Sequence, residues 1–229
     1  MLDFNEYRPN GLNNEIIENP GERHLPCVIL LDTSGSMASS VGQLHEGLSE
    51  LGTAIKDDDY AVGITEFCII TFNDETRIAM PFGPAYDYKE PEIYCNGSTA
   101  MHSAIDAALN EIEARKRQYK EQRTTYYRPW IFLLSDGMPN DPDNGAFERL
   151  KEAQYLGKCL FFPVGIGNHV DYELLKSLSK NKIVLKAERD NFKNAFEWLS
   201  SSISMVARSN ANQAVRLEDP RNFQLDVVV

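Results

Sequence analysis

Five oxygen-bearing side chains, spread over three segments of the chain, have the types and positions expected of a site for a hard cation. They are Asp32, Ser34, Ser36, Thr99 and Asp136. Two of the segments directly follow apolar runs, and the third follows a glycine turn. Oxygen ligands without His or Cys select hard cations, so Mg²⁺ is expected, and Mn²⁺ or Ca²⁺ would also fit. We expect no catalytic residue and no organic cofactor.

Alternating strands and helices would be needed to bring these segments together. Continuous apolar runs predict buried strands, and apolar residues at helical spacing predict helices. The predicted strands are 27–31, 64–72, 76–82, 130–135, 159–164 and 183–185. The predicted helices are 40–56, a long one from near residue 99, 145–157, 171–179 and 191–207. The far end of the long helix, the basic stretch 115–123, is expected to be a solvated face, with a second partner contact as the alternative.

The order of these elements predicts an α/β protein with a mainly parallel sheet and helices on both faces. Only three residues, Asn73-Asp74-Glu75, separate the second and third strands, which indicates an antiparallel hairpin. Ligands of such sheets bind beyond the carboxyl ends of the strands. Asp32 and Asp136 each follow a predicted strand, and Thr99 begins a helix, so all three are expected at that edge.

The expected site would hold its cation mainly through neutral hydroxyl groups, with the carboxylates standing behind water. Such an ion is poorly neutralised, and its remaining coordination position would favour an anionic oxygen. A glutamate or aspartate from another protein is the expected occupant. A helix N-terminus beside the ion would also favour a negative charge.

The pattern Asp32-x-Ser34-x-Ser36, followed by Thr99 and Asp136, resembles the metal-ion-dependent adhesion site (MIDAS) of von Willebrand factor A (vWA) domains. The resemblance covers roughly residues 25–207, between an N-terminal lead-in, 1–24, and a C-terminal tail, 208–229. It implies a three-layer Rossmann-like sandwich whose sheet has the order 3-2-1-4-5-6, with strand 3 antiparallel. It also implies direct metal contact by the three hydroxyl groups and mostly water-mediated contact by the two carboxylates.

Within that family, Pro26–Met37 looks most like the stand-alone bacterial proteins of the TerY type. This finer resemblance implies a role in a bacterial stress-response or signalling system. It would add a protein kinase and a phosphatase as partners.

The composition argues against several other classes of protein. A net charge of −11 disfavours nucleic acid and anionic membranes as partners. Residues 1–6 lack the pattern of a secretory leader, and the apolar runs are too short to span a bilayer. The four cysteines include no CxxC pair, which favours reduced thiols over disulfides. We therefore expect a cytoplasmic protein.

Other interpretations of the same residues are simpler or different in kind. Asp32 and the serines could merely cap a helix, although capping does not account for Thr99 and Asp136. The main alternative function is a Mg²⁺-dependent hydrolase or phosphatase, but Asp32-x-Ser34 lacks a second aspartate and the chain has no Gly-x-Ser-x-Gly elbow. A scaffold with a vestigial metal site is a third possibility. We therefore expect a binding protein and not an enzyme.

Two further features of the sequence are not expected to contribute to the cation site of this chain. Gly165-Ile166-Gly167 lacks the third glycine of a nucleotide-binding loop and is expected to be a turn. The tail after Arg208 could be disordered, could form an extra strand, or could offer an acidic side chain to a neighbouring molecule.

Overall fold

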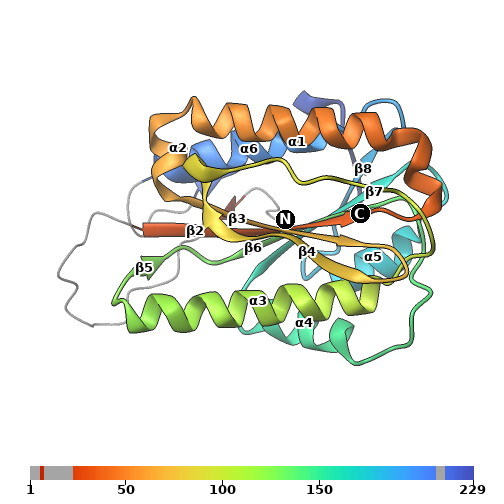
Figure 1. The fold of residues 1–229 in the computed structure, drawn as a ribbon, viewed down its shortest axis with the longest axis horizontal. Helices are drawn as coiled ribbons and strands as arrows, with labels where there is room; N and C mark the ends of the chain where they lie inside the picture. The colour runs from red at the N-terminus through yellow and green to blue at the C-terminus, as the bar shows by residue number, and fades with distance from the viewer. Residues whose placement is uncertain (1–5, 8–22, 210–214) are drawn as a thin grey trace.

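An eight-stranded sheet runs through the middle of the molecule in the computed structural model, which describes residues 6–7, 23–209 and 215–229 (Figure 1). Seven strands follow the order β10-β8-β7-β6-β2-β3-β4, and β5 pairs with β2. The strands are β2 (Arg23–Asp32), β3 (Thr65–Phe72), β4 (Thr76–Pro84), β5 (Thr125–Tyr126), β6 (Trp130–Ser135), β7 (Leu160–Ile166), β8 (Val184–Ala187) and β10 (Asp226–Val228).

The sheet is parallel except at its two ends. Strand β2 lies parallel to β3 and β6, and β7 lies parallel to β6 and β8. At one end β4 pairs antiparallel with β3, as the hairpin predicted, and at the other β10 pairs antiparallel with β8. Without β5 and β10, the order from β4 to β8 is 3-2-1-4-5-6 with the third strand antiparallel, which confirms the expected fold.

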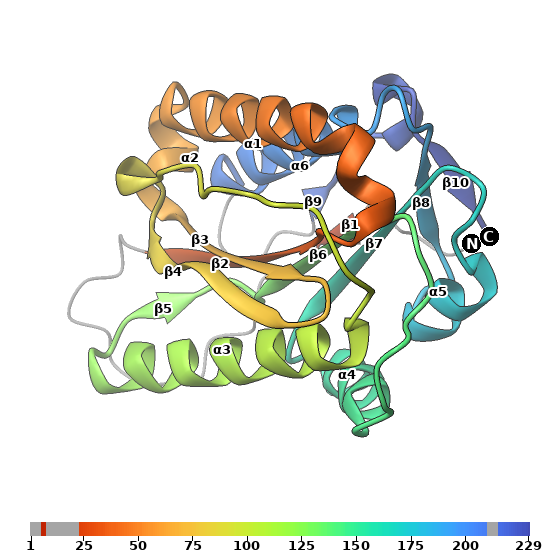
Figure 2. The same ribbon diagram turned by 45° about the vertical axis from the view of Figure 1, so that its right-hand side comes forward.

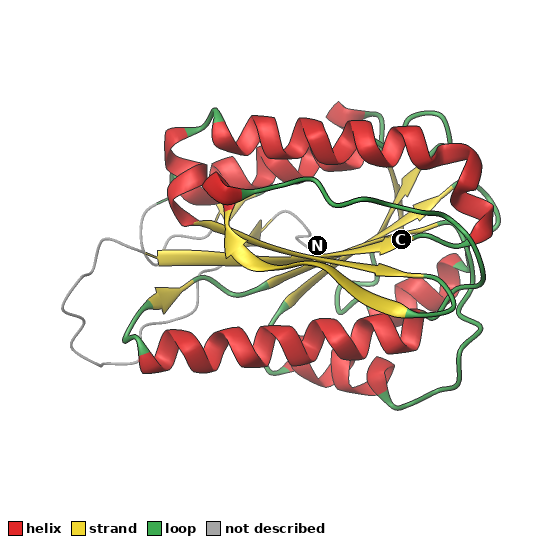
Figure 3. Ribbon diagram, viewed as in Figure 1, coloured by secondary structure: helices red, strands yellow, loops and turns green. Residues whose placement is uncertain are grey.

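Helices cover both faces of the sheet and make the sandwich three-layered (Figure 3). One face carries α1 (Val41–Lys56), α2 (Asp59–Ile64) and α6 (Asn194–Ala207). The other carries α3 (Met101–Glu121), α4 (Ala146–Tyr155) and α5 (Tyr172–Leu178). Short 3-10 helices occur at η1 (Gly35–Ser40), η2 (Ala85–Asp87) and η3 (Pro220–Phe223).

The apolar core lies in two layers, one on each side of the sheet. In β2, Cys27, Ile29 and Leu31 pack into the layer beneath α1 and α6. Their neighbours Val28 and Leu30 pack into the layer beneath α3. Successive residues of a strand point to opposite faces, so a strand covered on both sides must be apolar throughout. This is why the central strands appear in the sequence as unbroken apolar runs.

The ends of the chain add two small pieces of structure. Strand β1 (Glu6–Tyr7) pairs antiparallel with β9 (Val215–Arg216), and most of the predicted lead-in lies outside the described residues. The lead-in was expected to end at residue 24, but Arg23 already belongs to β2. In the tail, β10 extends the main sheet, so this part of the chain forms an extra strand along the domain.

Two local features differ from the sequence-based prediction. Helix α2 was not expected, and its N-terminus is capped by the Asp58 carboxylate, which accepts hydrogen bonds from the backbone N–H groups of Tyr60 and Ala61. The basic stretch 115–123 is not simply a solvated face. Arg115 donates two hydrogen bonds of 2.7 Å to the buried carboxylate of Glu66, and Tyr119 is buried.

The four cysteines, all of them within the described residues, are unpaired. Burial raises the pKa of Cys159 to about 11 and that of Cys68 to about 12, which makes both thiols unreactive at neutral pH. Among the helices of the described ranges, none has the length and apolar character that crossing a bilayer requires.

Candidate metal centre

The carboxyl ends of β2 and β6 bring two of the site segments side by side. These strands are parallel neighbours, with Leu31 paired to Leu134, so the residues that follow them leave the sheet at the same edge. Helix α3 begins near that edge, as the turned view in Figure 2 shows. The topology therefore places the loop after β2, the loop after β6 and the start of α3 together.

Asp32, the last residue of β2, is completely buried and held on both carboxylate oxygens. The Ser34 N–H donates to Oδ1 over 2.9 Å, and the Ser135 hydroxyl donates to Oδ2. Burial raises the pKa of Asp32, although these hydrogen bonds work in the opposite direction. A buried carboxylate of this kind is stabilised by a nearby positive charge.

A chain of hydrogen bonds joins three more of the candidates. The Ser34 and Ser36 hydroxyl oxygens are 3.0 Å apart, and the Ser36 hydroxyl donates to Oδ1 of Asp136 over 2.7 Å. Ser34 and Asp136 are buried, whereas Ser36 is exposed. The chain therefore runs from the interior of the site to its surface.

Thr99 completes the group from the side of α3. A Cβ atom placed on Gly137 would lie 3.1 Å from Oγ1 of Thr99 and 3.8 Å from Oδ2 of Asp32, so the threonine hydroxyl and the aspartate flank the same glycine. The Thr99 backbone is fixed by Asn140, whose side-chain oxygen accepts from the Thr99 N–H over 2.9 Å. The Asn140 N–H in turn donates to the Thr99 carbonyl over 3.1 Å.

The start of α3 is anchored by the loop that follows β6. The Asp141 carboxylate accepts hydrogen bonds from the backbone N–H groups of His102 and Ser103 and from the Ser103 hydroxyl, over 2.8 to 3.0 Å. An acidic side chain that satisfies free N–H groups at a helix start is a stabilising cap. Because Asp141 follows Asn140, one short segment fixes both Thr99 and the helix that carries it.

The loop before Thr99 depends on a glycine. Gly97 has a φ angle of +67°, and a Cβ atom there would lie 2.2 Å from a carboxylate oxygen of Asp74. That carboxylate accepts from the Ser98 N–H over 2.9 Å and from the Ser98 hydroxyl over 2.6 Å. The Gly97 carbonyl accepts from the Gly35 N–H over 3.0 Å, which ties this loop to the one after β2.

One residue of the site was not predicted from the sequence. Arg189 donates from Nη2 to Oδ2 of Asp136 over 2.6 Å and from Nη1 to the Ser36 carbonyl over 3.0 Å. It follows β8, whose carboxyl end lies at the same edge as those of β6 and β7. The rule that led to Asp32 and Asp136 would also have led to Arg189, had charged residues been sought after every strand.

The donor atoms present suit a hard divalent cation. Two carboxylates and three hydroxyl groups lie together, and oxygen donors of these types are the ligands that Mg²⁺, Mn²⁺ and Ca²⁺ prefer. The described residues contain no group of three or more His, Cys, Asp or Glu side chains that could hold a metal, so the hydroxyl groups are essential to this candidate. The structure thus brings the five candidate residues together, and their role as ligands remains a prediction.

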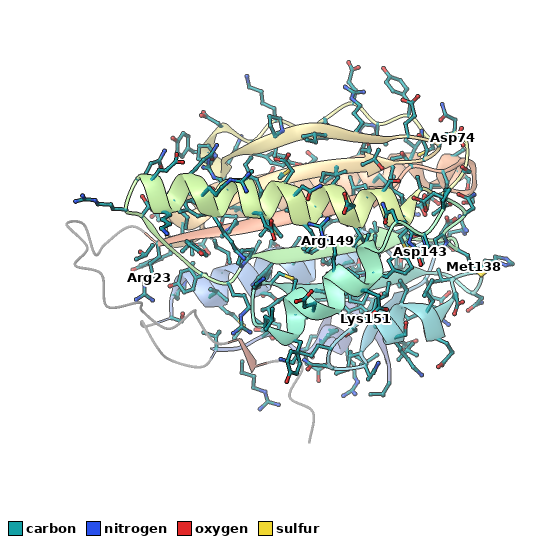
Figure 4. All side chains as sticks on the ribbon, turned by 90° about the horizontal axis from the view of Figure 1, so that it is seen from below. Arg23, Asp74, Met138, Asp143, Arg149 and Lys151 are labelled. Atoms are coloured by element: carbon teal, nitrogen blue, oxygen red, sulfur yellow. The ribbon has the colours of Figure 1, made fainter. Side chains whose placement is uncertain are left out.

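Two methionines beside the site differ in exposure. Met37, which follows Ser36, is buried in the core, whereas Met138 is 58% exposed. Figure 4 shows Met138 and Asp74 at one end of the molecule and Arg23, which begins β2, at the other. Gly165-Ile166-Gly167 was expected to be a turn, but Gly165 and Ile166 belong to β7. Gly167 follows the strand with a φ angle of +72°, and its carbonyl accepts a hydrogen bond from the Tyr172 hydroxyl.

The fold agrees with the comparison to known families. The von Willebrand factor type A domain matches residues 27–198, more than half of the chain, and the chain therefore belongs to the vWA family. Domains of this family often mediate metal-dependent protein interactions, and they are typically interaction modules and not enzymes. No curated protein sequence matches the chain.

Solved structures with the same fold come from diverse sources. The ArnB paralog VWA2 from Sulfolobus acidocaldarius is 17% identical, with a TM-score of 0.54, over 79% of this chain and 45% of that one. Pilus adhesin SpaC from Lactobacillus rhamnosus GG is 13% identical, with a TM-score of 0.64, over 84% and 31%. Proximal thread matrix protein 1 from the mussel byssus, solved with zinc in its MIDAS motif, is 13% identical, with a TM-score of 0.57, over 80% and 48%.

These likenesses concern the fold alone, because the identities are low. The chain spans less than half the length of each of the three proteins. More than half of each of those proteins therefore lies outside the region that matches this chain.

Proposed function

We propose that this chain is a metal-dependent protein-binding module with an intact MIDAS. Asp32, Ser34, Ser36, Thr99 and Asp136 would hold one divalent cation, Mg²⁺ in the first place. The cation would bind an aspartate or glutamate side chain of a partner protein. The observation that carries the proposal is the hydrogen-bonded path from Ser34 through Ser36 to Asp136, beside the buried carboxylate of Asp32.

The surroundings of the five residues support a site whose ligands are held in place before a cation binds. Backbone contacts from Asn140 hold Thr99, and the Ser34 N–H holds Asp32. When bound, the cation would supply a Lewis-acid centre that attracts an anionic oxygen. The five residues would position the cation and balance its charge. Because they are already held in place, they would bind it with little loss of conformational entropy.

The rim of the site supports access by a protein partner. Ser36 is exposed, and Met138, two residues after Asp136, is a large apolar side chain open to solvent. A flexible thioether side chain adapts readily to different partner surfaces. We propose that Met138 contacts the partner around the captured carboxylate.

The alternative of a metal-dependent hydrolase has less support from the contacts. Hydrolysis would need a general base within reach of the attacking water. Asp32 and Asp136 are already assigned to the cation, and their oxygens also accept hydrogen bonds from Ser34, Ser135, Ser36 and Arg189, so service as a base would compete with both roles. Turnover of generic phosphate esters that depends on Mg²⁺ and is lost in Asp32→Asn would favour the hydrolase instead.

The proposed function is tested by affinity capture from extracts of the source cell, followed by mass spectrometry. Capture by the wild-type chain with Mg²⁺ is compared with capture in the presence of a chelator and with capture by Asp32→Asn. Ser39→Ala, which removes an exposed hydroxyl of η1, is the matched control. We expect a partner that is lost in both treatments, retained by the control, and lost again when its own contacting acidic residue is changed to alanine. A partner retained by Asp32→Asn in chelator would contradict carboxylate capture.

The finer assignment to the TerY type is also a proposal. It rests on the resemblance of Pro26–Met37 and implies a cytoplasmic stress-response or signalling role, with a protein kinase and a phosphatase as partners. The same capture experiment tests it, since either enzyme among the metal-dependent partners would support it. Capture of unrelated acidic proteins alone would count against it.

A further inference from the structure

Arg189 contacts two of the loops that form the proposed metal site, and the inference about it rests on the proposed function. Its guanidinium group bridges Oδ2 of Asp136 and the carbonyl of Ser36, over 2.6 and 3.0 Å. It therefore joins a third loop to the two loops that carry most of the candidate ligands. About a third of the side chain is exposed, while the Asp136 side chain is fully buried.

The position of Arg189 is built into the fold at several points. Its backbone carbonyl accepts a hydrogen bond of 2.9 Å from the side-chain amide of Gln43, on the first turn of α1. A Cβ atom on Gly167 would lie 4.0 Å from Nε of Arg189, so this glycine turn flanks the side chain. The backbone of Arg189 is thus held from α1, and its guanidinium is held from both ligand loops beside the turn after β7.

Two charged residues just before Arg189 in the sequence pair with each other, whereas Arg189 itself pairs with the site. Glu188 is exposed and lies 3.5 Å from Lys186, and Lys186 also donates to Asn168 over 2.9 Å. The ion pair of Arg189 is with Asp136, a candidate metal ligand. Arginine keeps its charge at any pH at which the protein is folded, so this positive charge is permanent.

We propose that Arg189 is a built-in counter-cation that determines both the affinity of the site for metal and its selectivity for an acidic partner. Arg189 neutralises Asp136 in the structure, and a cation held by Asp136 would have to compete with it. With a divalent cation bound, the two carboxylates would balance its two charges, and Arg189 would give the site one net positive charge. The loaded site then favours an anionic ligand over a neutral one.

The overall charge of the protein shows why such a group would matter. The chain has a net charge of −11, so its long-range field repels an acidic partner. The fixed positive charge of Arg189 at the proposed site would counteract that field locally. Close range is where a single charge has its largest effect, since the interaction falls with distance and is screened by salt.

The experiment measures Mn²⁺ affinity by titration calorimetry for wild type, Arg189→Gln and Arg189→Lys. Even at the dielectric constant of water, a unit charge about 6 Å from a divalent ion changes the affinity for that ion by about tenfold, and the effect grows as the surroundings become less polar. We therefore expect Arg189→Gln to bind Mn²⁺ at least about tenfold more tightly and Arg189→Lys, which keeps the charge, to stay within about threefold of wild type. The matched control is Lys186→Gln, which makes the same change of charge away from Asp136 and is expected to leave the affinity unchanged.

A second arm measures anion selectivity with acetate as the probe. Acetate that binds the loaded site must raise the apparent Mn²⁺ affinity, because the two binding equilibria are linked. We expect this enhancement, measured against chloride at equal ionic strength, to be large in wild type and several-fold smaller in Arg189→Gln. Should the glutamine variant melt at a much lower temperature in chelator, Arg189→Met replaces it, since it retains an aliphatic stem.

The outcomes separate this inference from the proposed function. If wild type binds Mn²⁺ but Arg189→Gln binds it equally or more weakly, the counter-cation role is overturned and the metal site stands. If Lys186→Gln has the same effect as Arg189→Gln, or if Arg189→Lys behaves like Arg189→Gln, the role is likewise overturned. If wild type does not bind Mn²⁺, Mg²⁺ or Ca²⁺, the proposed function itself fails.

Discussion

The hydroxyl of Ser36 donates a hydrogen bond of 2.7 Å to the carboxylate of Asp136, a residue one hundred positions later in the chain. The bond joins the loop after β2 to the loop after β6, and a buried aspartate lies where each loop begins: Asp32 ends β2, and Asp136 directly follows β6. A change in one loop is therefore expected to alter the other.

Asp32→Asn is expected to abolish Mg²⁺ binding without unfolding the protein. An asparagine side chain can still accept from the Ser34 N–H through its oxygen and can place its amide against the Ser135 hydroxyl. It removes one of the two charges that would attract the ion. Calorimetric titration would show no binding, and circular dichroism in chelator would show a melting temperature no lower than that of wild type, because a buried charge is lost. Undiminished Mg²⁺ affinity would rule Asp32 out as a ligand.

Asp141→Ala is expected to lower stability and metal affinity together. It removes the acceptor for the His102 and Ser103 N–H groups at the start of α3, and loss of such a cap costs about 1 kcal/mol. Thr99, just before the helix, would be held less firmly, because its contacts with Asn140 remain but the helix start beside it is no longer anchored. Urea unfolding and Mn²⁺ titration measure the two effects. Asp143→Ala, which removes a largely exposed carboxylate from the same loop, should leave metal affinity nearly unchanged.

Gly97→Ala is expected to be more harmful than Gly145→Ala, although both glycines have positive φ angles. A Cβ atom added at Gly145 would meet no other atom within 4 Å, so its replacement costs only backbone strain, about 1 kcal/mol. At Gly97 the new methyl group would also displace Asp74 from Ser98. Urea unfolding should therefore show a larger loss for Gly97→Ala, and Mn²⁺ affinity should fall only in that variant. Equal losses in both variants would mean that Asp74 does not constrain this loop.

Glu66 is expected to make stability depend on pH in the acid range. Burial would raise its pKa, but hydrogen bonds from His24, Arg115 and Tyr119 outweigh this and hold the pKa at about 2, below its ordinary 4.5. A carboxyl group with a lowered folded-state pKa stabilises the fold above its ordinary pKa, and this contribution is lost as the pH falls towards the folded value. The loss would be roughly 3 kcal/mol at most.

The measurement is urea unfolding of wild type and Glu66→Gln at several pH values from neutral down to about 3. The glutamine variant should be less stable at neutral pH, since Arg115 loses its ionic partner, and its stability should fall less on acidification. Glu113→Gln, on the exposed side of α3, is the control and should follow wild type. Parallel pH profiles for wild type and Glu66→Gln would show that the Glu66 cluster does not hold the carboxylate in its charged form.

The sequence alone was enough for the central strands, most helices and the positions of the site segments, whereas the two-residue strands β1, β5 and β9 were not predicted. Strand β6 occupies the predicted residues 130–135, because a strand covered on both faces needs an unbroken apolar run. The hairpin of β3 and β4 followed from its short connection. The meeting of Asp32 with Asp136 could be expected because the carboxyl ends of parallel strands share one edge. In contrast, α2 has only six residues, too few for helical periodicity to reveal it.

Only the tertiary structure decided which polar groups pair with one another. The bond from Arg189 to Asp136, the cluster of Arg115 and Tyr119 on Glu66, and the hold of Asp74 on Ser98 join residues far apart in the chain. Apolar periodicity records which face of an element is buried, and burial acts on every residue of that face alike. A hydrogen bond depends on the direction and reach of two particular side chains, which are determined only once the strands and loops that carry them have packed together.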